Sequence, residues 1–269
     1  MQIHPTAIIH PKAELDEDVV IGPFTVIGEH VKIGWGTHVG SHVNLEGWTE
    51  IGARCQIFPF ASIGGPPQHL QYKDEPTRVF IGEQNIIREY VTIHRGTVFG
   101  GGHTTIGNHN FLMAYVHIAH DCQVGNNVIM ANAATLGGHI SIGHHAVISG
   151  LVGIHQYVRV GDYAMIGGCS RVARDVPPFV RASGNQISLY GLNSIGLRRA
   201  GFSQQRMRTL KKAYQLLFRR GERLAENIKL ARHEFHDSSD VLMLLTFLES
   251  SIRGMCRPAR KGTKEDEEL

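Results

Sequence analysis

Residues 19–40 read VVIGPFTVIGEHVKIGWGTHVG, and an aliphatic residue followed by glycine recurs in them at every sixth position. The recurring residues are Ile21, Ile27, Ile33 and Val39. Two positions before each of them stands a valine or a threonine: Val19, Thr25, Val31 and Thr37. The stretch therefore has a period of six residues, whereas an amphipathic helix would have a period of 3.6 and a half-buried strand a period of two.

The same period extends outward from this stretch in both directions, as far as Val172. It runs from Ile3 to Ile63, resumes over 81–93, and continues from Ile106 to Val172 after a shift of one residue. One inward aliphatic side chain in every six residues builds a three-faced prism of short strands, with about eighteen residues in each coil. We therefore predict an all-β parallel β-helix with coils ~4.8 Å apart. We expect each glycine to supply a turn conformation that a β-carbon would hinder.

Two segments interrupt the repeat. Residues 64–80 are rich in proline and charge, and residues 94–105 are rich in glycine. A regular solenoid does not need such long excursions, and surface loops often carry function. We expect at least one of them to line a binding site.

The C-terminal third has a different pattern. Pro177-Pro178 ends the last coil, so the β-helix is expected to span residues 1–178, and 179–201 reads as an irregular connection. Ser203 is a favourable N-cap, and an apolar stripe follows it. The sequence predicts an α-helical region over 202–256, with helices at 203–220, 222–236 and 239–253. A charged tail follows over 257–269, and its end, KGTKEDEEL (261–269), is expected to be disordered.

Composition excludes some functions. A net charge of +3 is too small for a nucleic-acid-binding protein. The four cysteines contain no CxxC pair, which favours a reducing compartment and thiols that act as small apolar residues. The N-terminus does not read as a signal peptide, and no apolar run approaches the ~18 residues of a transmembrane segment. We predict a cytoplasmic protein.

The eighteen-residue coil places certain polar residues together. His120, Gly138 and Gln156 are expected to form a column on one ridge, with Asp121 and His139 beside it. A histidine next to a carboxylate can act as a general base, because the carboxylate fixes the tautomer and stabilises the imidazolium. Gly138 offers a bare backbone N–H to a developing oxyanion. The alternative is a solvated histidine on a surface ridge.

The histidines also allow a metal-binding interpretation. Four residues separate His139 from His144, a spacing that trimeric β-helix carbonic anhydrases use together with a third histidine from a neighbouring subunit. Spacing alone leaves this alternative open.

From about residue 3 to about residue 253, the chain resembles the UDP-N-acetylglucosamine O-acyltransferases that open lipid A biosynthesis. The resemblance is carried by EPTRV (75–79), VTIHRGTV (91–98), HIAHDCQVGN (117–126), ATLGGHISI (134–142), IHQY (154–157), GGCSRVARDVPPFV (167–180) and GLNSIGLRRAGFS (191–203). These motifs are more specific for the family than the six-residue repeats (hexads), which many unrelated transferases share. The resemblance implies a left-handed β-helix homotrimer with active sites in clefts between subunits, and it implies no cofactor and no metal.

The resemblance also implies roles for individual residues. His120 falls on the general base, Asp121 on its acidic support, and Gly138 on the backbone N–H that polarises the thioester carbonyl. The residues that match the lining of the nucleotide-sugar and acyl cleft are Gln68, His117, His139, His155 and Gln156. The residues that match contacts to the nucleotide are Asn193 and Arg199.

The implied reaction moves an (R)-3-hydroxyacyl chain from acyl carrier protein directly to the 3-hydroxyl of UDP-N-acetylglucosamine, without an acyl-enzyme. Gly168 matches the position that sets acyl length, and its missing side chain should leave room for a long chain. The separation between His120 and Gly168 is not a whole number of coils. Gly168 is therefore expected on a different face, where the Gly168 of a neighbouring subunit could close the groove.

The chain departs from the family pattern on the acceptor side. His69 and Gln71 replace an acid and a lysine, while Ile195 and Ala200 replace a glutamate and an arginine. Transfer to the 3-amino analogue of the sugar nucleotide therefore stays open as an alternative.

A basic face of the first predicted helix is a candidate docking surface for the acidic carrier protein. A solvated helix face is the alternative. The residues concerned are Arg206, Arg208, Lys211, Lys212, Arg219 and Arg220.

Overall fold

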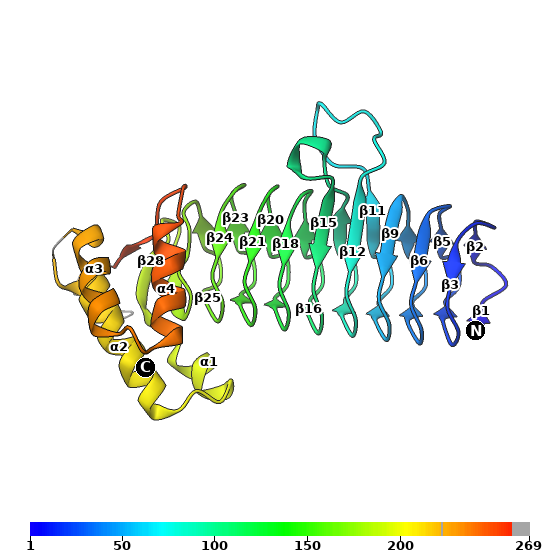
Figure 1. Ribbon diagram of the computed structural model, residues 1–269. Coiled ribbons are helices and arrows are strands. Elements are labelled where there is room, and N and C mark those ends of the chain that lie inside the picture. The colour runs from blue at the N-terminus through cyan, green and yellow to red at the C-terminus, as the bar shows by residue number, and fades with distance from the viewer. Residues whose placement is uncertain (222, 260–269) are drawn as a thin grey trace.

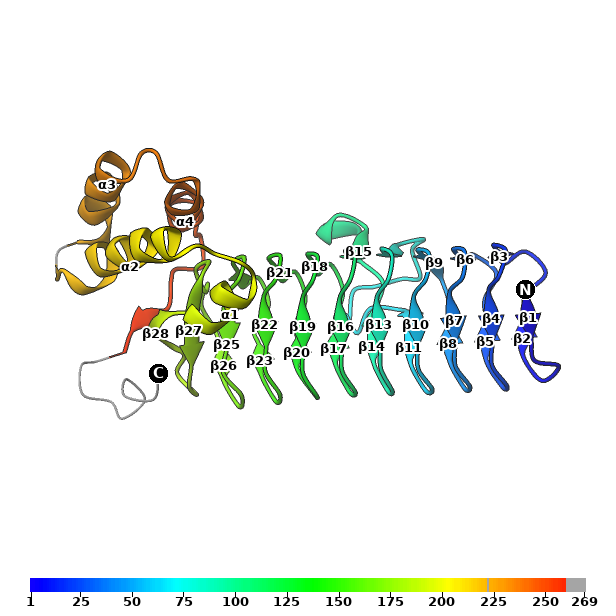
Figure 2. The ribbon, with the colours of Figure 1, turned by 90° about the horizontal axis from the view of Figure 1, so that it is seen from below.

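The computed structural model of the chain describes residues 1–221 and 223–259. These residues form an elongated solenoid of short strands with a helical region at its C-terminal end (Figures 1 and 2). Through the solenoid, each strand pairs in parallel with the strand one coil later, so the prediction of a parallel β-helix is confirmed. Within the described residues, no helix is long and apolar enough to cross a membrane.

Three sheets form the faces of the prism. Sheet A contains β1 (Gln2–Ile3), β4 (Val20–Ile21), β7 (His38–Val39), β10 (Gln56–Ile57), β13 (Ile86–Ile87), β16 (Phe111–Leu112), β19 (Ile129–Met130), β22 (Val147–Ile148), β25 (Met165–Ile166), β27 (Val180–Ser183), β28 (Ser188–Leu192) and β29 (Arg257–Pro258). Sheet B contains β2 (Ile8–Ile9), β5 (Val26–Ile27), β8 (Asn44–Leu45), β11 (Ser62–Gly65), β14 (Thr92–His94), β17 (His117–Ile118), β20 (Thr135–Leu136), β23 (Gly153–Ile154) and β26 (Arg171–Val172). Sheet C contains β3 (Glu14–Leu15), β6 (Val31–Ile33), β9 (Trp48–Ile51), β12 (Arg78–Ile81), β15 (His103–Ile106), β18 (Gln123–Val124), β21 (Ser141–Ile142) and β24 (Arg159–Val160).

The chain turns from sheet A to B at corner AB, from B to C at corner BC, and from C to A at corner CA. Both excursions leave at corner BC, one between β11 and β12 and the other between β14 and β15 (Figure 1). The second excursion contains a 3₁₀ turn, η1 (Val98–Gly100). Loops on one corner project in one direction, so the two excursions become neighbours in space.

The strand register explains the phase of the repeat. An ordinary coil consists of three hexads, as between His38 and its partner Gln56. The next partner of Gln56 is Ile86, five hexads further on, so the first excursion inserts two whole hexads. The partner of Ile86 is Phe111, four hexads and one residue further on. Whole hexads preserve the period of six, whereas the extra residue of the second excursion shifts the phase by one.

The interior of the prism is filled by the predicted inward positions. Ile27, Ile63 and Leu136 are almost fully buried, and the residues two positions earlier, such as Thr25, are buried as well. Ile3 is 44% exposed because no coil precedes it. Each coil therefore buries its aliphatic side chains against its neighbours, and stability accumulates by stacking.

The expected reason for the repeated glycines was wrong for most of them, although Gly64 does adopt a left-handed conformation (φ 85°). The left-handed turn positions are held mostly by other residues, among them Phe24 (φ 57°) and His42 (φ 55°), whereas Gly22 has an ordinary φ. A β-carbon on Gly22 would lie 2.7 Å from the carbonyl carbon and oxygen of Gly40 in the next coil. These glycines are required by close approach of backbone to backbone, a recognised role of glycine beside turn formation.

The connection over 179–201 is regular, contrary to expectation. β27 pairs with β25 and extends sheet A, and β28 then folds back antiparallel to β27. Helix α1 (Ser194–Arg199) follows. β29 pairs with β28, so Arg257 and Pro258, which begin the predicted charged tail, belong to sheet A. The rest of that predicted tail, from residue 260, lies outside the described residues.

The helical region consists of α2 (Gln204–Arg219), α3 (Leu224–Glu234) and α4 (Ser239–Glu249). Ser203 is the N-cap of α2 and its hydroxyl accepts from the backbone N–H of Arg206, as expected. Leu210 and Leu217 on the apolar stripe pack into a second core with α3 and α4. Tyr214 packs against the end of the main core, which joins the helices to the solenoid.

Candidate active site

Corner BC collects most of the predicted site residues. The backbone N–H of His139 donates to the carbonyl of His120 at 3.0 Å, and that of Tyr157 donates to Gly138 at 3.1 Å. These bonds confirm that His120, Gly138 and Gln156 stand above one another in successive coils. The two excursions leave from the same corner and reach the beginning of this column, where His69 meets His120 and Thr97 binds Asp121.

His120 and Asp121 form a hydrogen-bonded pair. Nδ1 of His120 lies 2.7 Å from Oδ2 of Asp121, and both residues are buried. An ionised carboxylate only accepts, so Nδ1 carries the proton. The lone pair of the neutral imidazole is then on Nε2, where it can take a proton from a bound substrate.

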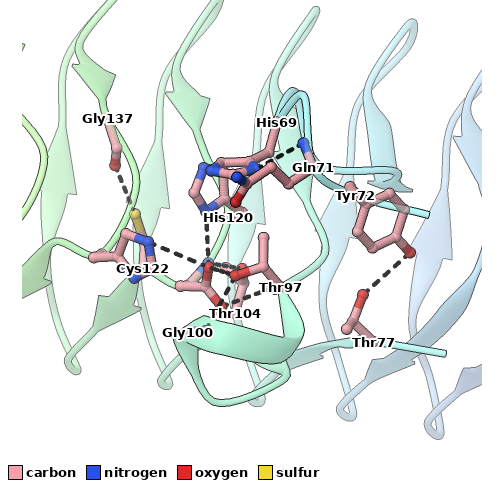
Figure 3. Close-up of polar contacts among 12 residues, drawn as sticks. His69, Gln71, Tyr72, Thr77, Thr97, Gly100, Thr104, His120, Cys122 and Gly137 are labelled. Atoms are coloured by element: carbon pink, nitrogen blue, oxygen red, sulfur yellow. Dashed lines mark hydrogen bonds and ion pairs between the residues drawn. The ribbon is translucent and has the colours of Figure 1, made fainter. Parts of the chain in front are cut away.

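The second excursion holds the carboxylate in place. Asp121 accepts from the backbone N–H of Thr97 at 2.8 Å and from the Thr97 hydroxyl at 2.7 Å (Figure 3). Its own backbone N–H donates to Thr104 at 2.8 Å. Burial alone would raise the pKa of Asp121, but the hydrogen bonds from His120 and Thr97 outweigh it and hold the pKa below its usual value. Asp121 is therefore an ionised, fixed support for His120.

Gly138 lies directly against the imidazole. A β-carbon there would lie 2.5 Å from Cε1 and 2.8 Å from Nε2 of His120. Among the described residues, no acceptor is found for the Gly138 N–H. A free N–H donor beside the basic nitrogen is the arrangement that stabilises a developing oxyanion.

Three further histidines surround the pair. The ring of His139 stacks on Tyr157 at 4.5 Å and meets His120 edge-on at 5.1 Å. Burial lowers the pKa of His139. His117 Nδ1 lies 2.7 Å from the hydroxyl of Thr92, and burial, with smaller contributions from neighbouring histidines, lowers its pKa to about 4. Burial also lowers the pKa of His94, so His94 and His117 favour their neutral forms in the folded protein.

The first excursion reaches the site through His69. Its ring meets the ring of His120 edge-on, with the centroids 5.3 Å apart (Figure 3). Gln68, which precedes it, is exposed. The first of the two excursions therefore contacts the candidate base, in line with the expectation that at least one of them lines a site.

The segment that follows the last helix borders the site on the side of the C-terminal coils. Arg253, which follows α4, places a guanidinium nitrogen 2.7 Å from Nδ1 of His155. A cleft of about 770 Å³ runs beside sheet C from Asp121 and His139 to Arg253. Sequence reasoning missed both Arg253 and Thr97, because neither lies at a multiple of eighteen from His120.

Three predicted residues lie elsewhere in the chain. Gly168 is at corner AB, on a different corner from His120, as expected. Asn193 caps α1 with its side-chain oxygen and donates to the carbonyl of Tyr163 at corner CA. Arg199 is exposed in the last turn of α1. Within one chain, these residues are not brought beside His120.

The metal interpretation from spacing is not supported. His144 lies at corner CA, away from His139 at corner BC, and its Nδ1 accepts from the backbone N–H of Asn126 at 2.9 Å. The side chains of His120, Asp121 and His139 do offer ligand atoms within 4.8 Å of one another. Their contacts are, however, those of a hydrogen-bonded base and its supports, with Asp121 held by Thr97.

Comparison with known proteins identifies the class first. Residues 12–47 and 103–138 match the model of the bacterial transferase hexapeptide, and relatives more than 50% identical over 95% of the chain are acyltransferases, so the chain is a hexapeptide-repeat transferase. Residues 175–256 match the model described as UDP N-acetylglucosamine O-acyltransferase, domain 2. The chain belongs to the UDP-N-acetylglucosamine O-acyltransferase family, which makes it an acyltransferase with a left-handed parallel β-helix.

Relatives and solved structures support this assignment over nearly the whole chain. An acyl-[acyl-carrier-protein]–UDP-N-acetylglucosamine O-acyltransferase from Thermodesulfovibrio yellowstonii is 58% identical over 95% of this chain and 99% of its own length. The enzyme of the same name from Halorhodospira halophila is 51% identical over the same shares. The structure of the Moraxella catarrhalis UDP-N-acetylglucosamine O-acyltransferase has a TM-score of 0.93 at 43% identity, covering 96% of this chain and all of that one. The Francisella novicida UDP-N-acetylglucosamine acyltransferase has a TM-score of 0.94 at 36% identity, covering 100% and 99%.

Proposed function

We propose that this chain transfers a 3-hydroxyacyl group from acyl carrier protein to the 3-hydroxyl of UDP-N-acetylglucosamine, the first step of lipid A biosynthesis. The observation that carries the proposal is the buried His120–Asp121 pair with the free N–H of Gly138 beside it. The names of the relatives supply the substrates and favour the hydroxyl acceptor over its 3-amino analogue.

The proposed reaction needs one base and one oxyanion donor. Nε2 of His120 takes the proton of the sugar 3-hydroxyl while that oxygen attacks the thioester carbonyl carbon. The Gly138 N–H stabilises the negative charge that develops on the carbonyl oxygen. The intermediate then collapses to the ester, the C–S bond breaks, and the carrier thiolate recovers the proton from the His120 imidazolium. Asp121 stays ionised throughout and stabilises that imidazolium.

The cysteines do not suit an acyl-enzyme route. Cys122 is nearest to the pair in sequence, but burial raises its pKa to about 12 and its thiol donates to the carbonyl of Gly137. Cys55 and Cys256 are also buried. Cys169 is exposed, contrary to the expectation that all four act as small apolar residues, and it lies at corner AB.

A homotrimer with sites between subunits is part of the proposal. Corner AB carries a ladder of exposed or partly exposed rings stacked about 5 Å apart, which leads toward Gly168: Phe24, His42, Phe60, Tyr90 and Tyr115. An apolar ridge of this length is suited to contact with another subunit. Packing corner AB of one subunit against corner BC of the next would bring a second Gly168 toward His120.

Gly168 has no structural need to be glycine. A β-carbon there would meet nothing closer than 3.4 Å, and its φ is not left-handed. This supports the proposed role in leaving room for a long acyl chain. Comparing 3-hydroxymyristoyl and 3-hydroxydecanoyl carrier proteins tests it, since a preference for the shorter donor would contradict the role.

The nucleotide and carrier contacts are proposed with one restriction. Asn193 and Arg199 are proposed to meet the nucleotide, together with cleft residues Gln68, His117, His139, His155 and Gln156. Two residues of the basic face of α2 already have partners within the chain. Arg206 forms a bidentate ion pair with Asp240 at 2.8 Å, and Arg219 donates to the carbonyl of Ala259. Arg208, Lys211 and Lys212 remain exposed for an acidic carrier.

The test is a transfer assay with 3-hydroxymyristoyl carrier protein and either UDP-N-acetylglucosamine or its 3-amino analogue. His120→Ala should abolish turnover, whereas His236→Ala should not, because His236 forms an exposed pair with Asp237 at 3.2 Å far along the chain. Turnover of the amino analogue alone would contradict an O-acyltransferase. Undiminished turnover by His120→Ala would contradict the proposed base.

A further inference from the structure

Arg95 is a buried cation for which the described residues supply no ion-pair partner. It stands at the start of the second excursion and only 7% of its surface is exposed. Among the described residues, no carboxylate forms an ion pair with it, and its Nε has no hydrogen-bond partner. Burying a guanidinium without a carboxylate is costly, so the contacts that it does make need a reason.

Those contacts lead to the first excursion. The guanidinium lies between two aromatic rings, 5.7 Å from the centroid of Trp48 and 5.7 Å from that of Tyr72. A terminal nitrogen of Arg95 donates to the Tyr72 hydroxyl at 3.0 Å. That hydroxyl donates in turn to the carbonyl of Glu75 at 2.6 Å and contacts the hydroxyl of Thr77 at 3.3 Å (Figure 3). The Arg95 guanidinium is therefore linked, through the Tyr72 hydroxyl, to Glu75 and Thr77 in the second half of the excursion.

This contact is the principal polar tie between the excursion and the solenoid. Within the described part of the chain, the Arg95–Tyr72 bond is the one hydrogen bond that joins residues 67–77 to residues outside them. The other bonds of this segment, such as His69 N–H to Pro67 and Tyr72 N–H to His69, are internal. Loosening the tie should free the segment as a unit.

The segment places His69 against His120 and exposes Gln68 beside it. Two positions beyond Arg95, Thr97 fixes Asp121. We propose that Arg95 and Tyr72 are positioning residues that clamp segment 67–77 over the site so that it binds the acceptor sugar nucleotide. This inference rests on the proposed function for the identity of the ligand, but the clamp itself is testable without turnover.

The clamp should affect binding and leave the chemistry unchanged. Segment 67–77 meets His120 through the edge of the His69 ring, whereas the His120–Asp121 hydrogen bond is held by Thr97, outside the segment. A loosened segment must be ordered again when ligand binds, so the cost falls on KM. The value of kcat at saturation and its pH profile should stay within about twofold of wild type.

The experiment compares Tyr72→Phe, Arg95→Lys and the double variant with wild type. Tyr72→Phe keeps the ring and removes only the hydroxyl, and Arg95→Lys keeps the charge and removes the planar fork. Tyr190→Phe is the matched control, because Tyr190 also lies 5.7 Å from a guanidinium, that of Arg181, but outside the site. Lys73 is exposed within the segment. The rate at which trypsin cleaves the native protein after Lys73, measured by mass spectrometry, therefore reports directly on how firmly the segment is held.

We expect each single variant to raise KM for UDP-N-acetylglucosamine about tenfold, a loss in the range of one hydrogen bond to a charged group. Cleavage after Lys73 should accelerate by a similar factor, and the double variant should be little worse than either single one. Unchanged cleavage in Tyr72→Phe and Arg95→Lys would overturn the clamp. Accelerated cleavage without weaker sugar-nucleotide binding would overturn its role in substrate positioning. If wild type does not turn over this acceptor, the proposed function fails while the cleavage result still decides the clamp.

Discussion

A β-carbon on Gly138 would lie 2.5 Å from Cε1 of His120, so the imidazole rests directly on the backbone of the next coil. Gly138→Ala should therefore push the ring away from its position and lower kcat about a hundredfold, the effect expected of a misplacement of about 1 Å. Gly153→Ala is the control, because a β-carbon there meets nothing within 4 Å. Steady-state kinetics with both variants checks this, and wild-type kcat in a folded Gly138→Ala protein would contradict it.

Asp121→Asn should reduce kcat by roughly 10²–10⁴-fold, because a neutral amide neither fixes the Nδ1–H tautomer nor stabilises the imidazolium. The pair is 2.7 Å apart and buried, so solvent cannot replace the carboxylate. Asp237→Asn, in the exposed His236–Asp237 pair, should leave kcat unchanged. Comparable kcat in Asp121→Asn and Asp237→Asn would argue against a supporting role for Asp121.

Thr97→Val should lower kcat about tenfold. It removes the 2.7 Å hydroxyl bond to Asp121 but keeps the shape of the side chain and the backbone bond. A hydrogen bond to a charged group contributes ~1.5–3 kcal/mol, and ~1.4 kcal/mol corresponds to a factor of ten. Thr97→Ser restores the hydroxyl and should restore most of the rate. If Ser and Val behave alike, the hydroxyl is not what positions Asp121.

The stability of the protein should fall as the pH drops from about 6.5 to about 4. In the unfolded chain His117 takes up a proton near its ordinary pKa of 6.5, whereas in the folded protein burial delays protonation until pH about 4. The unfolded state therefore binds more protons over this window, and acid favours it. Urea unfolding at several pH values should show a shallower decline for His117→Gln than for wild type. A His236→Gln control should decline like wild type.

Gly52→Ala should destabilise the fold by about 1–3 kcal/mol, as overpacking does. Its β-carbon would lie 2.7 Å from the backbone of Gly82, which cannot move without disturbing the next coil. Gly153→Ala has open space and should be neutral or stabilising by about 0.4–1 kcal/mol. Thermal unfolding of the two variants checks this, and equal stabilities would refute the account of close backbone approach.

The sequence by itself determined the β-helix, because the inward aliphatic side chains repeat at a spacing that no other regular structure shares. It also determined that His120, Gly138 and Gln156 stack, since residues one coil apart must lie above one another. The six-residue period also revealed the two excursions. The first inserts whole repeats and preserves the phase of the period, whereas the second shifts that phase by one residue.

Only the tertiary structure decided how the excursions serve the site. Thr97 and Tyr72 lie in segments without a repeat, so no periodicity relates them to Asp121 or Arg95, and their contacts depend on how two loops at one corner fold against each other. Arg253 meets His155 only because the helical region packs back on the last coils. The glycines likewise appeared in the sequence as turn residues, and only the distance between adjacent coils showed that close packing requires them. Local periodicity specifies a regular scaffold, whereas contacts between irregular segments depend on the complete fold.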